Sequence, residues 1–162
     1  MRDPVTTDEF KAAMAAFGSG VTVITTVDAA GEPFGLTATA FSSVSKNPPL
    51  CLVCVAHSAE AYPVIRDVGR FAVNILARSQ EDSAERFATH GIDKFAGVAW
   101  TRGGETGCPR LTGALASIEC VVTATIPAGD HDVFLGAIQS IRVEGGEPLV
   151  YFRGRYCDLT PR

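Results

Sequence analysis

Runs of β-branched and apolar residues, separated by short polar turns, dominate the pattern of this chain. The run VTVITTV is the clearest, because Val, Ile and Thr fit a pleated strand better than a helix. The segments PAGDH and EGGE carry the Gly, Pro and Asp residues that turns prefer. The pattern predicts strands at residues 21–27, 34–43, 50–56, 70–77, 116–126, 132–143 and 148–154.

Helical signals are few and lie between or before these strands. The sequence TTDE is a capping box, and apolar residues follow it at helical spacing, beginning with Phe10. Two more short helices are expected, one after Ser58 with Pro63 in its first turn and one over residues 80–88. Six or seven strands joined mostly by tight turns predict an all-β fold, a closed or nearly closed antiparallel barrel in a single domain over residues 1–162.

Composition and charge narrow the function classes. The chain has 162 residues, 46% of them apolar, which is enough for a core and for an apolar oligomer interface. A net charge of −4 without a Lys/Arg cluster argues against a nucleic-acid partner. No apolar run is long enough to span a bilayer, and the first residues lack the apolar core of a signal peptide. We therefore expect a cytoplasmic protein that binds neither nucleic acid nor membrane.

The residues that metal sites and hydrolases use are present but unsuitably spaced. Cys51 and Cys54 form a C-x-x-C inside a predicted strand, where residues three apart point to opposite faces and cannot share a metal or a disulfide. The three histidines are far apart, without partners at ligand spacing. The chain also lacks a dinucleotide-binding glycine motif, a Walker loop and the H-E-x-x-H and G-x-S-x-G motifs. We expect free thiols and no metal site.

The segment GLTATAFSSVSKNPPL is rich in small and hydroxyl side chains. In an extended chain Thr37, Thr39 and Phe41 would share one face and Ala38 and Ala40 the other. Small side chains on both faces leave backbone N–H and C=O groups open to a flat ligand, and the hydroxyls can bind a polyol or a phosphate. Alternatively, Thr and Ala simply fill a strand beside a Ser-rich turn. The segment alone leaves both interpretations open.

Two other positions have both a functional and a structural interpretation. Ser58 follows an apolar strand as a candidate helix N-cap, and the amides of Ala59 and Glu60 would then form an anion site. Alternatively, Glu60 complements the helix dipole without a ligand. His131 ends the motif GDH in a turn, where a solvated histidine is commoner than a catalytic one. The residues alone do not decide between these interpretations.

Taken together and in order, the motifs resemble the flavin reductase family. The likeness runs from Phe10 to about Leu159 and rests on FGSGVTVITT, GLTATAFSSVSKNPPL, FAVNIL, IECVV, GDH and PLVYFRGRY. It implies an FMN-binding split barrel with antiparallel Greek-key topology. It also implies a homodimer with the flavin near the subunit interface.

The resemblance further implies which residues contact the cofactors. One group lines the flavin, a second holds its phosphate or ribityl end, and Asn74 lies on a strand beside it. His131 and Tyr156 border the flavin face on which the nicotinamide stacks, and His131 is the implied catalytic residue, orienting the nicotinamide or neutralising charge. The first group is Thr37, Ala38, Thr39, Ala40, Phe41, Ser43 and Val44, and the second is Ser58, Ala59 and Glu60.

The activity implied by the resemblance is that of an NAD(P)H:flavin oxidoreductase. Such an enzyme passes a hydride from NADH or NADPH to FMN or FAD and supplies reduced flavin to a separate monooxygenase component. The cofactors carry this chemistry, while the protein orients them. The alternatives are a split barrel that retains FMN and acts on another substrate, a non-catalytic flavin or haem binder, and an interaction module.

Overall fold

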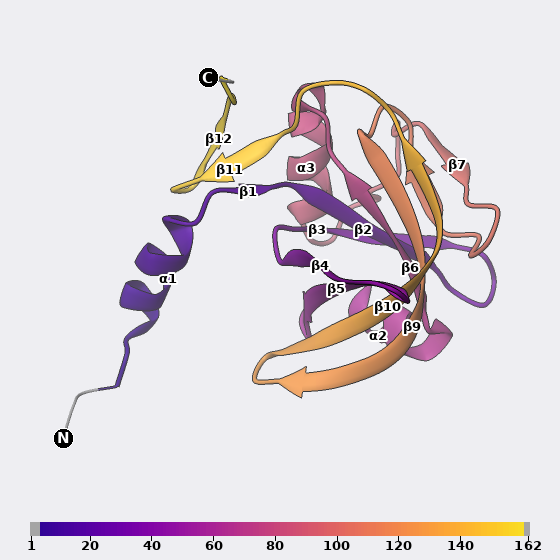
Figure 1. Ribbon diagram of the computed structural model, residues 1–162, viewed down its shortest axis with the longest axis horizontal. Helices are drawn as coiled ribbons and strands as arrows, with labels where there is room; N and C mark the ends of the chain where they lie inside the picture. The colour runs from indigo at the N-terminus through magenta and orange to yellow at the C-terminus, as the bar shows by residue number, and fades with distance from the viewer. Residues whose placement is uncertain (1–3, 161–162) are drawn as a thin grey trace.

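The computed structural model describes residues 4–160 and shows an antiparallel β structure with short peripheral helices (Figure 1). Residues 1–3 and 161–162 of the predicted single domain lie outside the described part. The strands are β1 (Ser19–Gly20), β2 (Thr22–Val27), β3 (Pro33–Ala38), β4 (Phe41–Lys46), β5 (Pro49–Ala56), β6 (Arg70–Ile75), β7 (Trp100–Arg102), β8 (Pro109–Leu111), β9 (Ala116–Ala128), β10 (His131–Val143), β11 (Val150–Phe152) and β12 (Arg155–Cys157). The helices are α1 (Thr7–Ala15), α2 (Tyr62–Val68) and α3 (Glu81–Ala88), with a 3₁₀ turn η1 (Arg78–Gln80) before α3.

Seven of these strands form one antiparallel sheet in the order β3-β2-β6-β9-β10-β5-β4. The β9–β10 hairpin separates β5 from β6, which follow each other in the chain, and this crossover is typical of a Greek key. In the register, Val23 of β2 lies opposite Asn74 of β6, and Val133 of β10 opposite Cys54 of β5. The sheet coils around a buried core, which confirms the predicted antiparallel Greek-key barrel.

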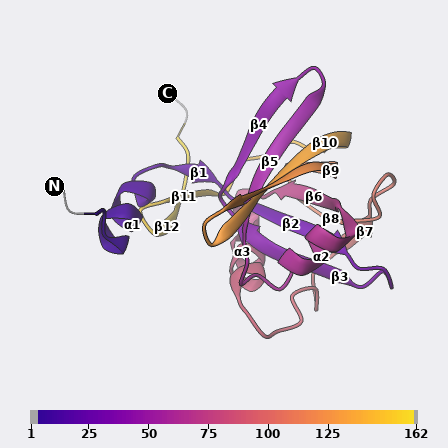
Figure 2. The same ribbon diagram turned by 90° about the horizontal axis from the view of Figure 1, so that it is seen from below.

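The segment at residues 34–43 differs from its prediction. The pattern predicts one strand, whereas the structure has two, β3 and β4, at opposite edges of the seven-stranded sheet. Thr39 and Ala40 carry the chain between them, and the carbonyl oxygen of Ala40 accepts a hydrogen bond from the N–H of Cys54 at 3.0 Å. The β4–β5 hairpin projects away from the other strands (Figure 2). Because tertiary pairing ends β3, local strand propensity did not reveal the break.

Two buried clusters stabilise the barrel. The larger fills its interior and includes Ile24, Val53, Phe71 and Phe134, all fully buried. The smaller lies between the barrel and α3 and includes Phe87. Strand β2 contributes to both clusters, and every one of its residues is buried. Each large apolar side chain buried in this way stabilises the fold by about 1.5–3 kcal/mol.

The N-terminal helix α1 has the predicted capping box but little contact with the barrel. The N–H of Glu9 donates to Oγ1 of Thr6, and the N–H of Thr6 donates to Oε2 of Glu9. None of its residues is buried, and it stands away from the barrel (Figure 1). Phe10, Met14 and Phe17, from the helix and the residues after it, are each more than half exposed. Across residues 4–160, no helix is long and apolar enough to cross a membrane.

The other two helices pack against the barrel. Ile65 of α2 is fully buried in the larger cluster, and Pro63 lies in the first turn of α2 as predicted. Helix α3 begins at Glu81, one residue beyond the predicted start, and buries Phe87 against the barrel. Both helices therefore cover apolar residues of the sheet.

The cysteines are free thiols in this structure. Cys51 is buried in the core and Cys54 is half-buried on the other face of β5, which confirms their predicted opposite directions. The sulfur atoms of Cys51 and Cys120 lie 3.5 Å apart. Their hydrogen bond, together with burial, raises the pKa of the Cys120 thiol. Cys120 therefore packs as a neutral, apolar side chain.

A substitution at Gly136 of β10 can test how tightly the barrel interior is packed. A Cβ atom at this position would lie 2.7 Å from Cζ of Phe71 and 2.9 Å from Cβ of Cys120. We predict that Gly136→Ala lowers the free energy of unfolding by about 1–3 kcal/mol, because the core must move to admit the methyl group. In the control Gly145→Ala the new Cβ meets no described atom within 4 Å. Urea unfolding measures both variants, and equal losses would contradict the packing argument.

Candidate functional site

A groove opens at the end of β3, beside the β11–β12 hairpin. Thr37, Ala38 and Thr39 line it on one side, and Tyr151 and Tyr156 lie across from them around a cavity of about 200 Å³. The two tyrosine rings contact each other edge to face, with centroids 5.3 Å apart. Tyr156 lies on β12, a strand that the sequence pattern did not predict, opposite Tyr151 on β11. The structure therefore brings four predicted cofactor residues together, Thr37, Ala38, Thr39 and Tyr156.

The backbone beside this groove is open on one side. Within the described residues, β3 pairs with β2 alone and β4 with β5 alone, because they are the two edges of the sheet. Thr39 and Ala40, between these strands, are exposed. Edge strands present unpaired N–H and C=O groups, so a flat ligand can form hydrogen bonds here through its edge. The hydroxyl of Thr37 is already used, since it donates to the carbonyl oxygen of Ala84 at 2.6 Å.

The predicted alternation of faces along this segment is wrong beyond Ala38. Ala38 and Phe41 both pack against the larger buried cluster, because the break between β3 and β4 interrupts the alternation. Ser43 and Val44 are exposed further along β4, where the pairing with β5 is irregular.

The turn after β5 does not have the predicted helix-capping geometry. Helix α2 begins at Tyr62 with Ala61 at its N-cap and no side-chain cap, so Ser58 is not the capping residue. The strand and the helix are separated by a turn in which the N–H of Ala59 donates to the carbonyl oxygen of Ala56 at 3.0 Å. The turn at Ser58 therefore lacks the helix N-terminus on which the predicted anion site was based.

Glu60 is held by the loop that follows α3. Its Oε1 accepts a hydrogen bond from the N–H of Gly91 at 2.9 Å, which is the main cause of its lowered pKa. Its Oε2 lies 3.5 Å from Nζ of Lys94. The buried Lys94 side chain also donates to the carbonyl oxygens of Gly35 and Phe87. Sequence reasoning missed Lys94, because only the folded loop brings this charge beside the turn.

Asn74 lies outside the groove. Its side chain is fully buried and donates to the carbonyl oxygens of Val23 and Pro109. It accepts hydrogen bonds from the N–H of Leu111 at 2.8 Å and from the hydroxyl of Ser117 at 3.0 Å. The polar atoms of its side chain are therefore engaged inside the chain. The position of its strand beside the flavin stays a prediction.

His131 lies at the tip of the β9–β10 hairpin. Its Nδ1 is 2.7 Å from Oδ1 of Asp130, and this hydrogen bond is the main cause that lowers the pKa of Asp130. Asp130 also borders an open cleft of about 460 Å³, with Phe10 of α1 on its other side. Figure 1 shows the hairpin tip well apart from β12, and the residues that line the groove include Tyr156 but not His131.

A second histidine beside this hairpin was not predicted as a site residue. Nε2 of His57 lies 2.9 Å from Oδ1 of Asp132, and the hydroxyl of Tyr62 donates to Oδ2 at 2.9 Å. The hydrogen bond with His57 is the main cause that lowers the pKa of Asp132, and the carboxylate in turn raises the pKa of Tyr62. No local motif signals this cluster, because its members come from three separate segments.

The groove suits binding and orientation. Among the described residues that line it only the tyrosines ionise, and burial is the main cause that raises the pKa of Tyr156. Its phenol is therefore protonated at neutral pH. Aromatic rings, small side chains and open backbone fit a flat heteroaromatic ring such as a flavin.

The chain matches a family model described as a flavin reductase like domain over residues 14–160, and it belongs to that family. This match confirms the resemblance drawn from the sequence motifs. It also agrees with the fold, since the structural neighbours of this chain are flavin reductases with the same barrel.

Individual relatives cover almost all of this chain. A probable flavin reductase of Rhizobium meliloti is 45% identical over 150 residues, which cover 93% of this chain but only 47% of that relative. This chain thus spans about half the length of that protein. The reductase subunit HsaB of a flavin-dependent monooxygenase from Rhodococcus jostii is 37% identical, over 94% of this chain and 77% of its own length. The solved NADH:FAD oxidoreductase SgcE6 of Streptomyces globisporus, in complex with NAD and FAD fragments, has a TM-score of 0.92 and 35% identity, over 99% of this chain and 97% of that chain.

The hydrogen-bonded cluster of Asp132, His57 and Tyr62 predicts how the stability of the protein depends on pH. Because the fold lowers the pKa of Asp132 below 3.8, its carboxylate stabilises the native state above that pH. This contribution is lost as the pH falls through the lowered pKa. We predict that Asp132→Asn destabilises the protein at neutral pH, and that its stability then falls less than that of the wild type below about pH 4.

Thermal unfolding across this pH range measures the effect. Asp67→Asn removes an exposed carboxylate and serves as the control. If Asp132→Asn and Asp67→Asn respond to acid in the same way, the stabilising role of the cluster is refuted.

Proposed function

We propose that this protein is an NAD(P)H-dependent flavin reductase that supplies reduced flavin to a separate monooxygenase. The observation that carries the proposal is the groove where small residues and open backbone at Thr37–Thr39 face Tyr156. A flat ring system fits such a surface, and the chain belongs to a family of flavin reductases. The names of HsaB and SgcE6 support the same reaction class. The proposal includes a cytoplasmic location.

The residues at the groove would hold the flavin. The open backbone at Thr39 and Ala40 would bind the polar edge of the ring, and Tyr156 would contribute an aromatic wall. Ser58 and the adjoining turn would hold the ribityl or phosphate end. Ser58 is exposed and makes no side-chain hydrogen bond within residues 4–160, so its hydroxyl is available. The Glu60 carboxylate, in contrast, anchors the neighbouring loop.

When bound, the cofactors supply the redox chemistry, in which a hydride passes from C4 of the nicotinamide to N5 of the flavin. The groove residues would bind the reactants, orient them and keep them in contact. Such orientation alone can raise the rate of a reaction by a large factor. Donors at the open backbone edge would stabilise negative charge that develops on the bound ring. His131 would orient the nicotinamide or neutralise charge, since its ring is partly exposed and held by Asp130. NADH is the proposed hydride donor, with NADPH as the alternative, and FMN or FAD is the acceptor.

A homodimer is part of the proposal, because one chain leaves the site incomplete. His131 and the groove are apart within one chain, and the cleft between Asp130 and α1 is open. Phe10, Met14 and Phe17 are exposed beside this region and provide an apolar surface for a second copy. The sedimentation coefficient of the purified chain tests this part of the proposal directly.

NADH consumption by the purified chain, with and without FMN, FAD or riboflavin, tests the proposed activity. We expect turnover that rises and saturates with added flavin. We also expect Tyr156→Ala to raise the KM for flavin about fivefold through loss of an aromatic contact worth ~1 kcal/mol. Tyr156→Phe, which retains the ring, should behave like the wild type.

Other outcomes favour the alternatives. A yellow protein that consumes NADH without added flavin indicates retained FMN. Flavin or haem spectra without turnover indicate a binding protein. No consumption of NADH or NADPH with any flavin refutes the reductase proposal.

His131→Ala separates orientation of the nicotinamide from flavin binding. We expect single-turnover flavin reduction by NADH to slow by up to about a hundredfold, because misplacement of a reactant by ~1 Å can cost that much. The flavin affinity should stay unchanged. His90→Ala, at an exposed position on another loop, is the control. A wild-type rate in His131→Ala would remove this residue from the mechanism.

A further inference from the structure

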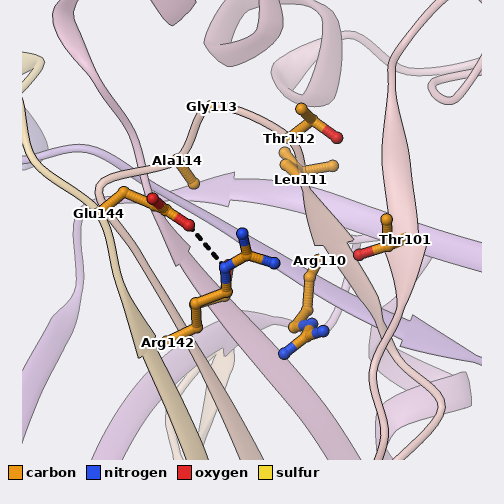
Figure 3. Close-up of a pocket in the computed structure, with 9 residues that line it drawn as sticks. Thr101, Arg110, Leu111, Thr112, Gly113, Ala114, Arg142 and Glu144 are labelled. Atoms are coloured by element: carbon orange, nitrogen blue, oxygen red, sulfur yellow. Dashed lines mark hydrogen bonds and ion pairs between the residues drawn. The ribbon is translucent and has the colours of Figure 1, made fainter.

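A second cavity, of about 270 Å³, lies where β7 and β8 meet the start of β9 and the end of β10 (Figure 3). Two arginines line it, Arg110 from β8 and Arg142 from β10. Thr101 and Thr112 add hydroxyl groups to the lining, and Ser117 lies at its β9 side. Charged donors and hydroxyls around one cavity are a typical constellation for binding an oxyanion.

The β8 wall of this cavity is fixed by Asn74. The side chain of Asn74 bonds to the backbone of Pro109 and of Leu111, the two residues that flank Arg110. The hydroxyl of Ser117 donates to the same side chain. Pro109 and Leu111 are buried, whereas Arg110 between them is half-buried, because neighbouring side chains of a strand point to opposite faces. The buried amide thus fixes the backbone from which the Arg110 side chain extends.

Arg110 has unused hydrogen-bonding capacity. Its Nε is buried and has no hydrogen-bond partner within the described residues. Its Nη1 forms a long ion pair with Oε1 of Glu119 at 3.9 Å, and this oxygen also has no hydrogen-bond partner within the described residues. The other carboxylate oxygen of Glu119 accepts three hydrogen bonds from Glu105 and Thr106. The guanidinium group of Arg110 therefore makes no hydrogen bond within the described residues, and a ligand in the cavity can supply an acceptor.

Arg142 leaves most of its donors available as well. Its Nε donates to Glu144, whose carboxylate is the one acidic group in the cavity lining. Both side chains of this ion pair are about half exposed, so breaking the pair costs little free energy. The remaining guanidinium nitrogens of Arg142 project toward the interior of the cavity, on the side of Arg110 (Figure 3).

This cavity is separate from the flavin groove. The smaller buried cluster lies between them. Leu111 of this cluster borders the cavity, whereas Val21 of the cluster and Tyr156, which packs against it, border the groove. The charged and hydroxyl lining of the cavity suits a molecule that carries an oxyanionic group.

We propose that the cavity between Arg110 and Arg142 binds the carboxylate or phosphate group of a small anionic metabolite. The two guanidinium groups recognise the oxyanion from opposite walls, and Thr112 supplies a hydroxyl at the rim. The site acts independently of flavin binding and does not rest on the proposed reductase activity.

Calorimetric titration of the flavin-free chain with inorganic phosphate, and separately with benzoate, tests the site at constant ionic strength. We expect saturable binding of at least one of the two, which identifies the group recognised. Arg142→Gln should weaken it roughly tenfold to a hundredfold, the worth of a charge-assisted hydrogen bond. Arg102→Gln removes the same charge from the neighbouring strand β7 outside the cavity and should bind like the wild type.

Three results would overturn the proposal. These are no saturable binding of either anion, equal affinity in Arg142→Gln and the wild type, or loss of anion binding when saturating riboflavin, which has no phosphate, is present. Flavin-dependent NADH consumption by Arg142→Gln should equal that of the wild type. The anion site and the reductase activity can therefore fail independently of each other.

Discussion

The link of two residues between β3 and β4 constrains the whole barrel. Because Thr39 and Ala40 join opposite edges of one seven-stranded sheet, the sheet must coil until those edges meet. The inner face is then tightly packed, and Gly136 leaves the space that the Phe71 ring fills. The outer sides of both edges stay unpaired next to the link. The residues that close the barrel are thus the residues that present open backbone at the groove.

This arrangement is consistent with the proposed reductase activity, although the described residues that line the groove include no acidic or basic side chain apart from the tyrosines. Hydride transfer between two bound ring systems depends on their distance and orientation, which a rigid sheet edge and aromatic walls can control. The polar clusters of the protein lie outside the groove and stabilise the fold. Glu60 and Lys94 hold the loop after α3. Asp132 binds His57 and Tyr62 and so connects β10 to the turn and helix after β5. In the proposed dimer, the position of His131 relative to the groove depends on how two barrels associate.

Most strands were predictable from the sequence, because β-branched runs such as that of β2 and the short turns between them are local signals. The break at Thr39 and Ala40 was not, since both flanking strands have good strand propensity and only their pairing differs. The small and hydroxyl side chains of Thr37–Thr39 indicated a possible ligand surface, and family resemblance added Tyr156. The burial of the Asn74 side chain was not predictable, because a motif gives no side-chain burial. Arg110 and Arg142 went unnoticed, since strand pairing alone brings them to one cavity.

The exposed helix α1 has a consequence for assembly. A helix of nine residues is marginally stable alone, even with its capping box, and none of its residues is buried against the barrel. Its hydrogen bond from the N–H of Arg153 to the carbonyl oxygen of Ala15 ties down only one end. In the proposed dimer, folding of α1 is therefore coupled to the association of the two subunits. The fraction of chains with α1 folded then rises with protein concentration, because a higher concentration favours the dimer. Dilution would then unfold the N-terminal segment before it disturbs the barrel.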